Sequence, residues 1–120
     1  MLNSYKELNV WKKSVDLVIE IYKLTEYFPK SEIYGLTNQI RRAAISLPSN
    51  IAEGYSRRHK KEYIQFLRIA FGSGAELETQ LVIAKKIKLA NLIEFKQCEE
   101  LLVEIMKMLN KLISTLVAKP

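Results

Sequence analysis

Apolar residues recur along this chain at the three- and four-residue spacing of amphipathic helices. The spacing holds in four stretches, at about 8–28, 33–57, 60–88 and 92–117, separated by short polar connections. In the last stretch an alternating rhythm of three and four residues runs from Phe95 to Leu116, which favours lengthwise packing at a shallow angle. The pattern predicts an all-α fold, an antiparallel up-down-up-down four-helix bundle that forms one domain over residues 1–120.

Residues that end or begin helices stand at the connections. Pro29 should end the first helix because it pushes the residue before it out of the helical region, and Ser31 can then cap the second helix. His59 occupies the cap position of a capping box that Ser or Thr more often fills. Asn91 marks the start of the fourth helix. Connections this short join antiparallel neighbours.

The second stretch contains a proline inside its apolar stripe. Pro48 removes one helical hydrogen bond and clashes with the preceding turn, so the helix should kink or break there. We predict a kink at Pro48, because Ile51 keeps the helical phase that Leu36 and Ile40 set.

A polar stripe runs beside the apolar one and touches the predicted core. We expect it to form an interhelical or intersubunit hydrogen-bonding seam, which we call the polar seam. Its predicted members are Gln39, Arg42, Ser46, Asn50 and Glu53, with Glu76 on the third helix.

Two further features of the second and third stretches predict contacts between them. With these helices antiparallel, Arg42 lies level with Glu76 and Glu78, which favours an ion pair within or between subunits over a nucleic-acid contact. Gly72 and Gly74 interrupt the third helix at a cost of about 1 kcal/mol each relative to alanine. We expect these glycines to permit close approach by Ala43, Ala44 and Leu47 of the second helix.

Composition excludes several classes of protein. Apolar residues make up 48% of the 120, and the chain has only four glycines and three prolines, which argues against disorder and against a many-turned β architecture. No apolar run approaches the roughly 20 residues that cross a bilayer, and the first residues lack the apolar segment of a signal peptide. We therefore expect a cytoplasmic protein. The single cysteine, Cys98, falls in helical phase and reads as a small core residue.

Positive charge is unevenly placed. Nineteen Lys and Arg against 13 Asp and Glu give a net charge of +6. In the predicted topology one end of the bundle, the basic pole, collects Lys6, Lys12, Lys13, Arg57, Arg58, Lys60, Lys61, Lys111 and Lys119. We predict that Arg57, Arg58, Lys60 and Lys61 contact nucleic-acid phosphates, with Lys12 and Lys13 in support. A solvated turn that keeps the protein soluble is the alternative.

The residues for enzyme chemistry are sparse. One histidine and one cysteine offer little to a metal ion, and the Glu-x-x-His ligand pair of di-iron bundles is absent. The Gly72–Gly74 segment lacks the lysine and spacing of a phosphate loop, and Ser46, Ser49 and Ser73 have no histidine base near them in sequence. We expect no metal site, no cofactor and no enzyme activity.

Several motifs occur together in order over nearly the whole chain. They are ELNVW at 7–11, YGL at 34–36, QIRRAA at 39–44, SLPSNIAEG at 46–54 and ELET at 76–79. With them the chain resembles the four-helix-bundle proteins encoded in intervening sequences of bacterial large-subunit ribosomal RNA genes. The resemblance implies a bacterial homopentamer shaped like a barrel or ring. It also implies kinship with the accessory variability proteins of diversity-generating retroelements, basic pentamers that bind a reverse transcriptase and nucleic acid. It supplies no catalytic residues.

Two functional hypotheses follow. The first is a non-enzymatic homo-oligomer, a pentamer, whose basic pole binds RNA or DNA. The second is a structural adaptor that binds a protein partner, such as a reverse transcriptase or a ribosome-associated factor, through its outer helical faces. In that case exposed apolar residues outside the core phase would form the docking surface, and the candidates are Ile19, Ile45, Ile64 and Phe71.

Overall fold

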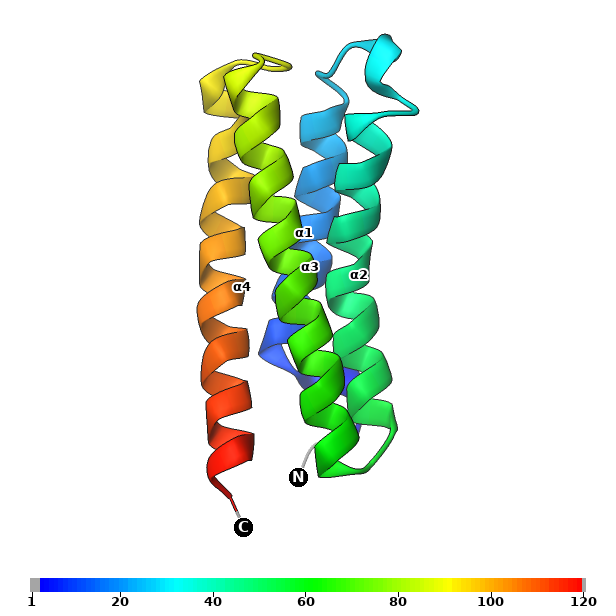
Figure 1. Cartoon of the computed structure of the whole chain (residues 1–120), viewed down its shortest axis with the longest axis vertical. Helices are drawn as coiled ribbons and strands as arrows, with labels where there is room; N and C mark the ends of the chain where they lie inside the picture. The colour runs from blue at the N-terminus through cyan, green and yellow to red at the C-terminus, as the bar shows by residue number, and fades with distance from the viewer. Residues whose placement is uncertain (1–2, 120) are drawn as a thin grey trace.

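The computed structural model describes residues 3–119. Its four α-helices are α1 (Asn9–Thr25), α2 (Leu36–Ser56), α3 (Lys60–Lys86) and α4 (Leu92–Ala118), with short 3₁₀ helices η1 (Tyr5–Glu7) and η2 (Lys30–Glu32). No strand occurs among the described residues. Figure 1 shows the four helices side by side, with the chain reversing direction at each connection. The all-α four-helix bundle that the hydrophobic pattern predicts is confirmed.

The helices enclose one elongated core. The bundle measures 48 × 20 × 20 Å, and α1 and α3 each pack against α2 and α4. The most extensive packing joins α2 and α3. Each helix contributes one buried apolar stripe, as its spacing predicts, and the fully buried side chains include Leu17, Ile21, Ile40, Leu47, Ile51, Leu67, Leu77, Phe95, Ile105 and Leu109.

The connection between α1 and α2 is longer than the sequence predicts. The helix α1 ends at Thr25 instead of Phe28, because the backbone amides of Tyr27 and Phe28 bond to carbonyls three residues back. The helix α2 begins at Leu36 instead of Ile33, because η2 occupies part of the segment.

The predicted helix caps differ from the observed ones. Gly35, not Ser31, precedes α2, and the side chain of Glu32 accepts a hydrogen bond from the Leu36 amide at 3.3 Å. His59 and Asn91 do occupy the cap positions of α3 and α4, but neither side chain makes a capping hydrogen bond. The sequence therefore locates the starts of α3 and α4 correctly and assigns the wrong cap to α2.

Pro48 is buried inside α2, and the helix continues through it without a break. A break at this position is therefore excluded. The kink there stays a prediction.

The two glycines of α3 do not pack against α2, so the predicted close approach is wrong. A Cβ atom on Gly72 would meet nothing within 4 Å, while one on Gly74 would collide with the Met106 side chain of α4. The tight contact between α2 and α3 lies instead at Gly54, where a Cβ would stand 2.6 Å from the Cβ of Phe66. Gly54 lets the two helices converge just before their connection.

No helix among residues 3–119 is long and apolar enough to span a membrane.

Candidate nucleic-acid interface

One end of the bundle combines three chain segments. The helix α2 passes into α3 there through Arg57, Arg58 and His59, and η1 packs against both α1 and α2. The Lys60 ammonium donates a hydrogen bond to the carbonyl of Lys119, so the start of α3 is joined to the end of α4. Figure 1 shows the end of α4 at this end of the bundle. Segments far apart in sequence thus meet at the basic pole.

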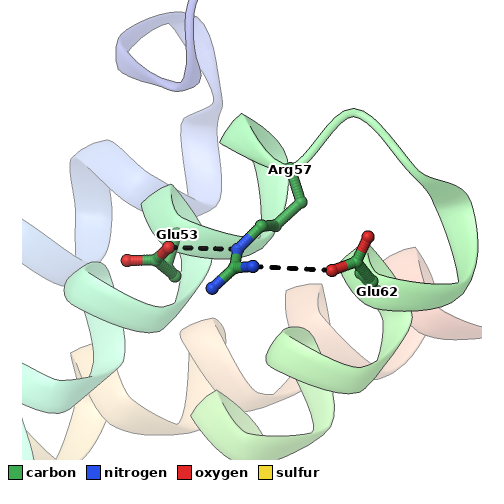
Figure 2. A network of polar contacts seen from close by, with 3 residues as sticks. All are labelled: Glu53, Arg57 and Glu62. Carbon is green, nitrogen blue, oxygen red and sulfur yellow. Dashed lines mark hydrogen bonds and ion pairs between the residues drawn. The ribbon is translucent and has the colours of Figure 1, made fainter.

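Arg57 is held between two carboxylates. Its Nε lies 3.2 Å from Glu53 Oε2 and its Nη1 lies 3.6 Å from Glu62 Oε1 (Figure 2). The guanidinium also stands over the ring of Phe66, with Cζ 5.1 Å from the ring centroid. These contacts link the end of α2 to the first turn of α3, so Arg57 braces the connection and has less charge to offer a phosphate.

The other five predicted phosphate contacts divide into two groups. The Lys13 ammonium lies 3.1 Å from Glu104 Oε1 on α4. Lys12, Arg58 and Lys61 are exposed, and within residues 3–119 no carboxylate comes within ion-pair distance of them. Lys60 is exposed beside them. Among the predicted phosphate contacts, Lys12, Arg58 and Lys61 are therefore the cations without a carboxylate partner in the described part of the chain.

Arg58 has an unusual backbone conformation. Its φ of 62° lies in the left-handed region, which side chains other than glycine, asparagine and aspartate adopt infrequently. Lys88, after α3, has the other positive φ among the described non-glycine residues, at 61°. At Arg58 this conformation turns the chain between two antiparallel helices and leaves a cation at the tip of the turn.

The middle of the polar seam joins two helices. The Ser46 hydroxyl lies 2.8 Å from that of Ser73 on α3, and the amide nitrogen of Asn50 donates to the Ser46 hydroxyl and carbonyl, each at 2.8 Å. All three side chains are half-buried. Sequence reasoning missed Ser73, although the antiparallel register of α2 and α3 and its place between two glycines both point to it.

The remaining seam residues lie on the surface. Gln39, Arg42, Glu53 and Glu76 are exposed, and Glu76 accepts a long hydrogen bond from Gln80 at 3.4 Å. In the described part of the chain Arg42 makes no ion pair with Glu76 or Glu78. An ion pair within the subunit is thus wrong for Arg42, and the pair between subunits stays a prediction.

Arg41, the neighbour of Arg42, joins α2 to α1. It donates from Nε to the Thr25 hydroxyl at 2.9 Å, and its guanidinium stacks on Tyr22 with Cζ 4.4 Å from the ring centroid. Its charge is therefore used in packing between these helices.

A hollow of about 640 Å³ opens at the basic pole. We call it the tyrosine hollow, because Tyr5, Tyr55 and Tyr63 line it together with Arg58, His59 and Lys60. Burial, with a smaller contribution from Tyr55, raises the pKa of Tyr63 to about 12. In the sequence Tyr55 and Tyr63 flank the basic run at 56–61, whereas only the fold brings Tyr5 to this hollow.

Cys98 lies in the core as its helical phase predicts. Burial, followed by the Glu20 and Glu99 carboxylates, raises the pKa of its thiol to about 12. Such a thiol is a poor nucleophile and a poor metal ligand. No group of three or more His, Cys, Asp or Glu side chains placed to hold a metal ion occurs within residues 3–119.

Comparison with known proteins identifies the family. The family model described as 23S rRNA-intervening sequence protein matches residues 6–111, nearly the whole chain. The chain belongs to this family. The resemblance that the motifs carry is thereby confirmed.

A solved structure shares the fold. It is the crystal structure of a protein with unknown function from the S23 ribosomal protein family of Bacteroides thetaiotaomicron, and it matches with a TM-score of 0.80 at 23% sequence identity. The match covers 88% of this chain and 95% of that one. A search of curated proteins found no match. The kinship with retroelement accessory proteins and the pentameric assembly stay predictions for this member of the 23S rRNA-intervening sequence protein family.

Proposed function

We propose that this protein is a non-enzymatic homo-oligomer, a pentamer, whose basic pole binds RNA or DNA. The observation that carries the proposal is that three exposed cations of the basic pole, Lys12, Arg58 and Lys61, have no carboxylate partner among the described residues. Phosphates would supply the missing negative charge, and the released counterions would drive binding. Lys60 supports them from the first turn of α3.

Arg57 and Lys13 have different roles in this proposal from those that the sequence predicts. Arg57 holds the α2–α3 connection through Glu53 and Glu62, and Lys13 joins α1 to α4 through Glu104. Both would set the geometry of the pole and would contribute to phosphate binding only through the long-range field.

Assembly would multiply the charge of the pole. Val82, Ile83 and Val103 expose 45–48% of their surface around a shallow apolar hollow on α3 and α4. A neighbouring copy would remove this apolar surface from water. Copies arranged in a ring would bring several basic poles together. A mass in solution of about five times 13.9 kDa would support the pentamer, and a monomer mass would contradict it.

Charge reversal tests nucleic-acid binding. Lys12→Glu, Arg58→Glu and Lys61→Glu are combined in one variant, and Lys30→Glu, Lys88→Glu and Lys96→Glu in a matched control at the opposite end, where all three lysines are exposed. We expect the first variant to lose measurable binding to labelled RNA and DNA at low salt, and the control to bind as the parent does. Equal loss in both variants, or no binding by the parent, would contradict the proposal.

A protein adaptor is the second candidate. Ile19 and Ile45 expose 50% and 41% of their surface, and Ile19 lies with Val18 and Tyr22 around a shallow apolar hollow on α1. Ile64 and Phe71 are half-buried, so the prediction that they are exposed is wrong; Phe71 packs against the core. Capture of a protein that survives nuclease treatment, together with no binding of purified nucleic acid, would favour the adaptor.

A further inference from the structure

The tyrosine hollow has the size and the lining of a ligand site. Its volume of about 640 Å³ falls within the roughly 300–1,000 Å³ of small-molecule pockets. Aromatic and basic residues line the same space, together with Ser4 and Ser56. Aromatic surface suits a planar base, and cations suit a phosphate attached to it.

Two rings of the lining are held in place by other aromatic rings. Tyr5 meets Trp11 edge-on with centroids 5.3 Å apart, and Tyr63 meets Tyr55 edge-on with centroids 5.6 Å apart. A capping box fixes η1, in which the Ser4 side chain accepts from the Lys6 amide and the Glu7 carboxylate accepts from the Ser4 amide. A lining ordered in this way loses little conformational entropy when a ligand binds.

The cations of the hollow come from the α2–α3 connection. Arg58 lines the hollow from a left-handed backbone position, where glycine would be less strained. Lys60 lines it from the first turn of α3, where the amino end of the helix adds to the positive potential. The cations that line the hollow are thus part of the basic pole.

We propose that the tyrosine hollow binds one unpaired nucleotide of a single strand. The base lies against the tyrosine rings and the flanking phosphates lie at Arg58 and Lys60. This rests on the proposed function of the basic pole and adds a preference for single strands over duplexes, since a paired base cannot enter the hollow.

The test compares strands and variants. Affinities for one short RNA, the DNA of the same sequence and the corresponding duplexes are measured with the parent, with Tyr5→Leu, with Tyr5→Phe and with Tyr34→Leu. Tyr34 is a matched control because it is 94% exposed and lies near the start of α2, at the opposite end from the α2–α3 connection. Circular dichroism checks that each variant is folded.

We expect the parent to prefer single strands. Tyr5→Leu should weaken single-strand binding by about tenfold, as loss of one stacked base does, and leave duplex binding unchanged. Tyr5→Phe, which keeps the ring, and Tyr34→Leu should bind as the parent does. Equal weakening of single strands and duplexes by Tyr5→Leu, or no weakening of either, would overturn the proposal.

Titration with a nucleoside monophosphate tests nucleotide binding in the hollow separately from the proposed function of the basic pole. The titration should shift the backbone amide resonances of Ser4, Ser56 and His59, which line the hollow. These shifts without any polynucleotide binding would overturn the basic-pole proposal and support nucleotide binding in the hollow. Polynucleotide binding without these shifts would overturn nucleotide binding in the tyrosine hollow and support nucleic-acid binding by the basic pole.

Discussion

At the scale of single residues, four hydroxyl groups on the helices donate to their own backbone, and one buried hydroxyl has no partner among the described residues. Ser14, Thr25, Thr79 and Thr115 each donate to the carbonyl four residues earlier in their helix, at 2.7–2.9 Å. Thr37 is buried, but its hydroxyl has no hydrogen-bond partner among the described residues. Thr37 is the second residue of α2, so the residue four positions earlier lies outside the helix.

Replacing Thr37 and Thr25 by valine should have opposite effects on the free energy of unfolding. Thr37→Val removes a desolvated hydroxyl without a partner and should raise the free energy of unfolding by about 1 kcal/mol. Thr25→Val removes a hydroxyl that donates to Ile21 and accepts from Arg41, and should lower it by about 1–2 kcal/mol. Urea unfolding measures both. A Thr37→Val variant less stable than the parent would show that the hydroxyl has a partner in solution.

Burial in the core could be predicted from helical phase, but the polar partners could not. Cys98 and Phe95 lie where their spacing puts them, because period alone decides which face of a helix is buried. The basic run predicts Arg57 as a phosphate contact, although Glu53 stands four residues before it, a spacing that favours an ion pair. Its second partner, Glu62, depends on the geometry of the connection, which sequence pattern does not supply.

At the scale of the helices, the three glycines of α2 and α3 have three different environments. Gly54 on α2 faces Phe66 and Tyr63 of α3, Gly74 faces Met106 of α4, and Gly72 faces open space. Glycine spacing in the sequence does not distinguish these cases. They depend on the crossing of helices from different parts of the chain.

Alanine substitution should have opposite effects on stability at Gly72 and at Gly54. Gly72→Ala should raise the free energy of unfolding by about 1 kcal/mol, because alanine favours a helix interior and meets nothing there. Gly54→Ala should lower it by about 1–3 kcal/mol, because its Cβ would press on Phe66 and on the Tyr63 carbonyl oxygen, a backbone atom 3.3 Å away. Thermal unfolding ranks the parent and the two variants by stability. A Gly54→Ala variant as stable as Gly72→Ala would contradict the close packing of α2 and α3.

The predicted helix ends lie within three residues of the observed ones, and the largest differences are on the two sides of the 3₁₀ helix η2. The starts of α3 and α4 follow His59 and Asn91 as predicted, since polar cap residues there precede strongly periodic segments. Between α1 and α2 the signals at Pro29 and Ser31 mark η2 instead of a new α-helix. A segment too short for helical periodicity gives no reliable signal.

At the scale of the whole molecule, alternating helix direction is what makes the basic pole. Charges at the start of α1, in the α2–α3 connection and at the end of α4 meet only because the chain reverses three times (Figure 1). Because the sequence pattern predicts an up-down-up-down topology, it also predicts that these charges meet at one end of the bundle. It could not predict which cations Glu62 and Glu104 would neutralise, and these carboxylates pair with Arg57 and Lys13.

The salt dependence of RNA affinity tests the basic pole most directly. With at least three phosphates neutralised per subunit, the logarithm of the association constant for a single strand should fall against the logarithm of salt concentration with a slope of about −2 or steeper. Lys61→Gln should make this slope shallower by about 0.7, and Lys30→Gln, at the other end of the bundle, should leave it unchanged. A flat dependence for the parent, or the same change in slope for both variants, would contradict the account.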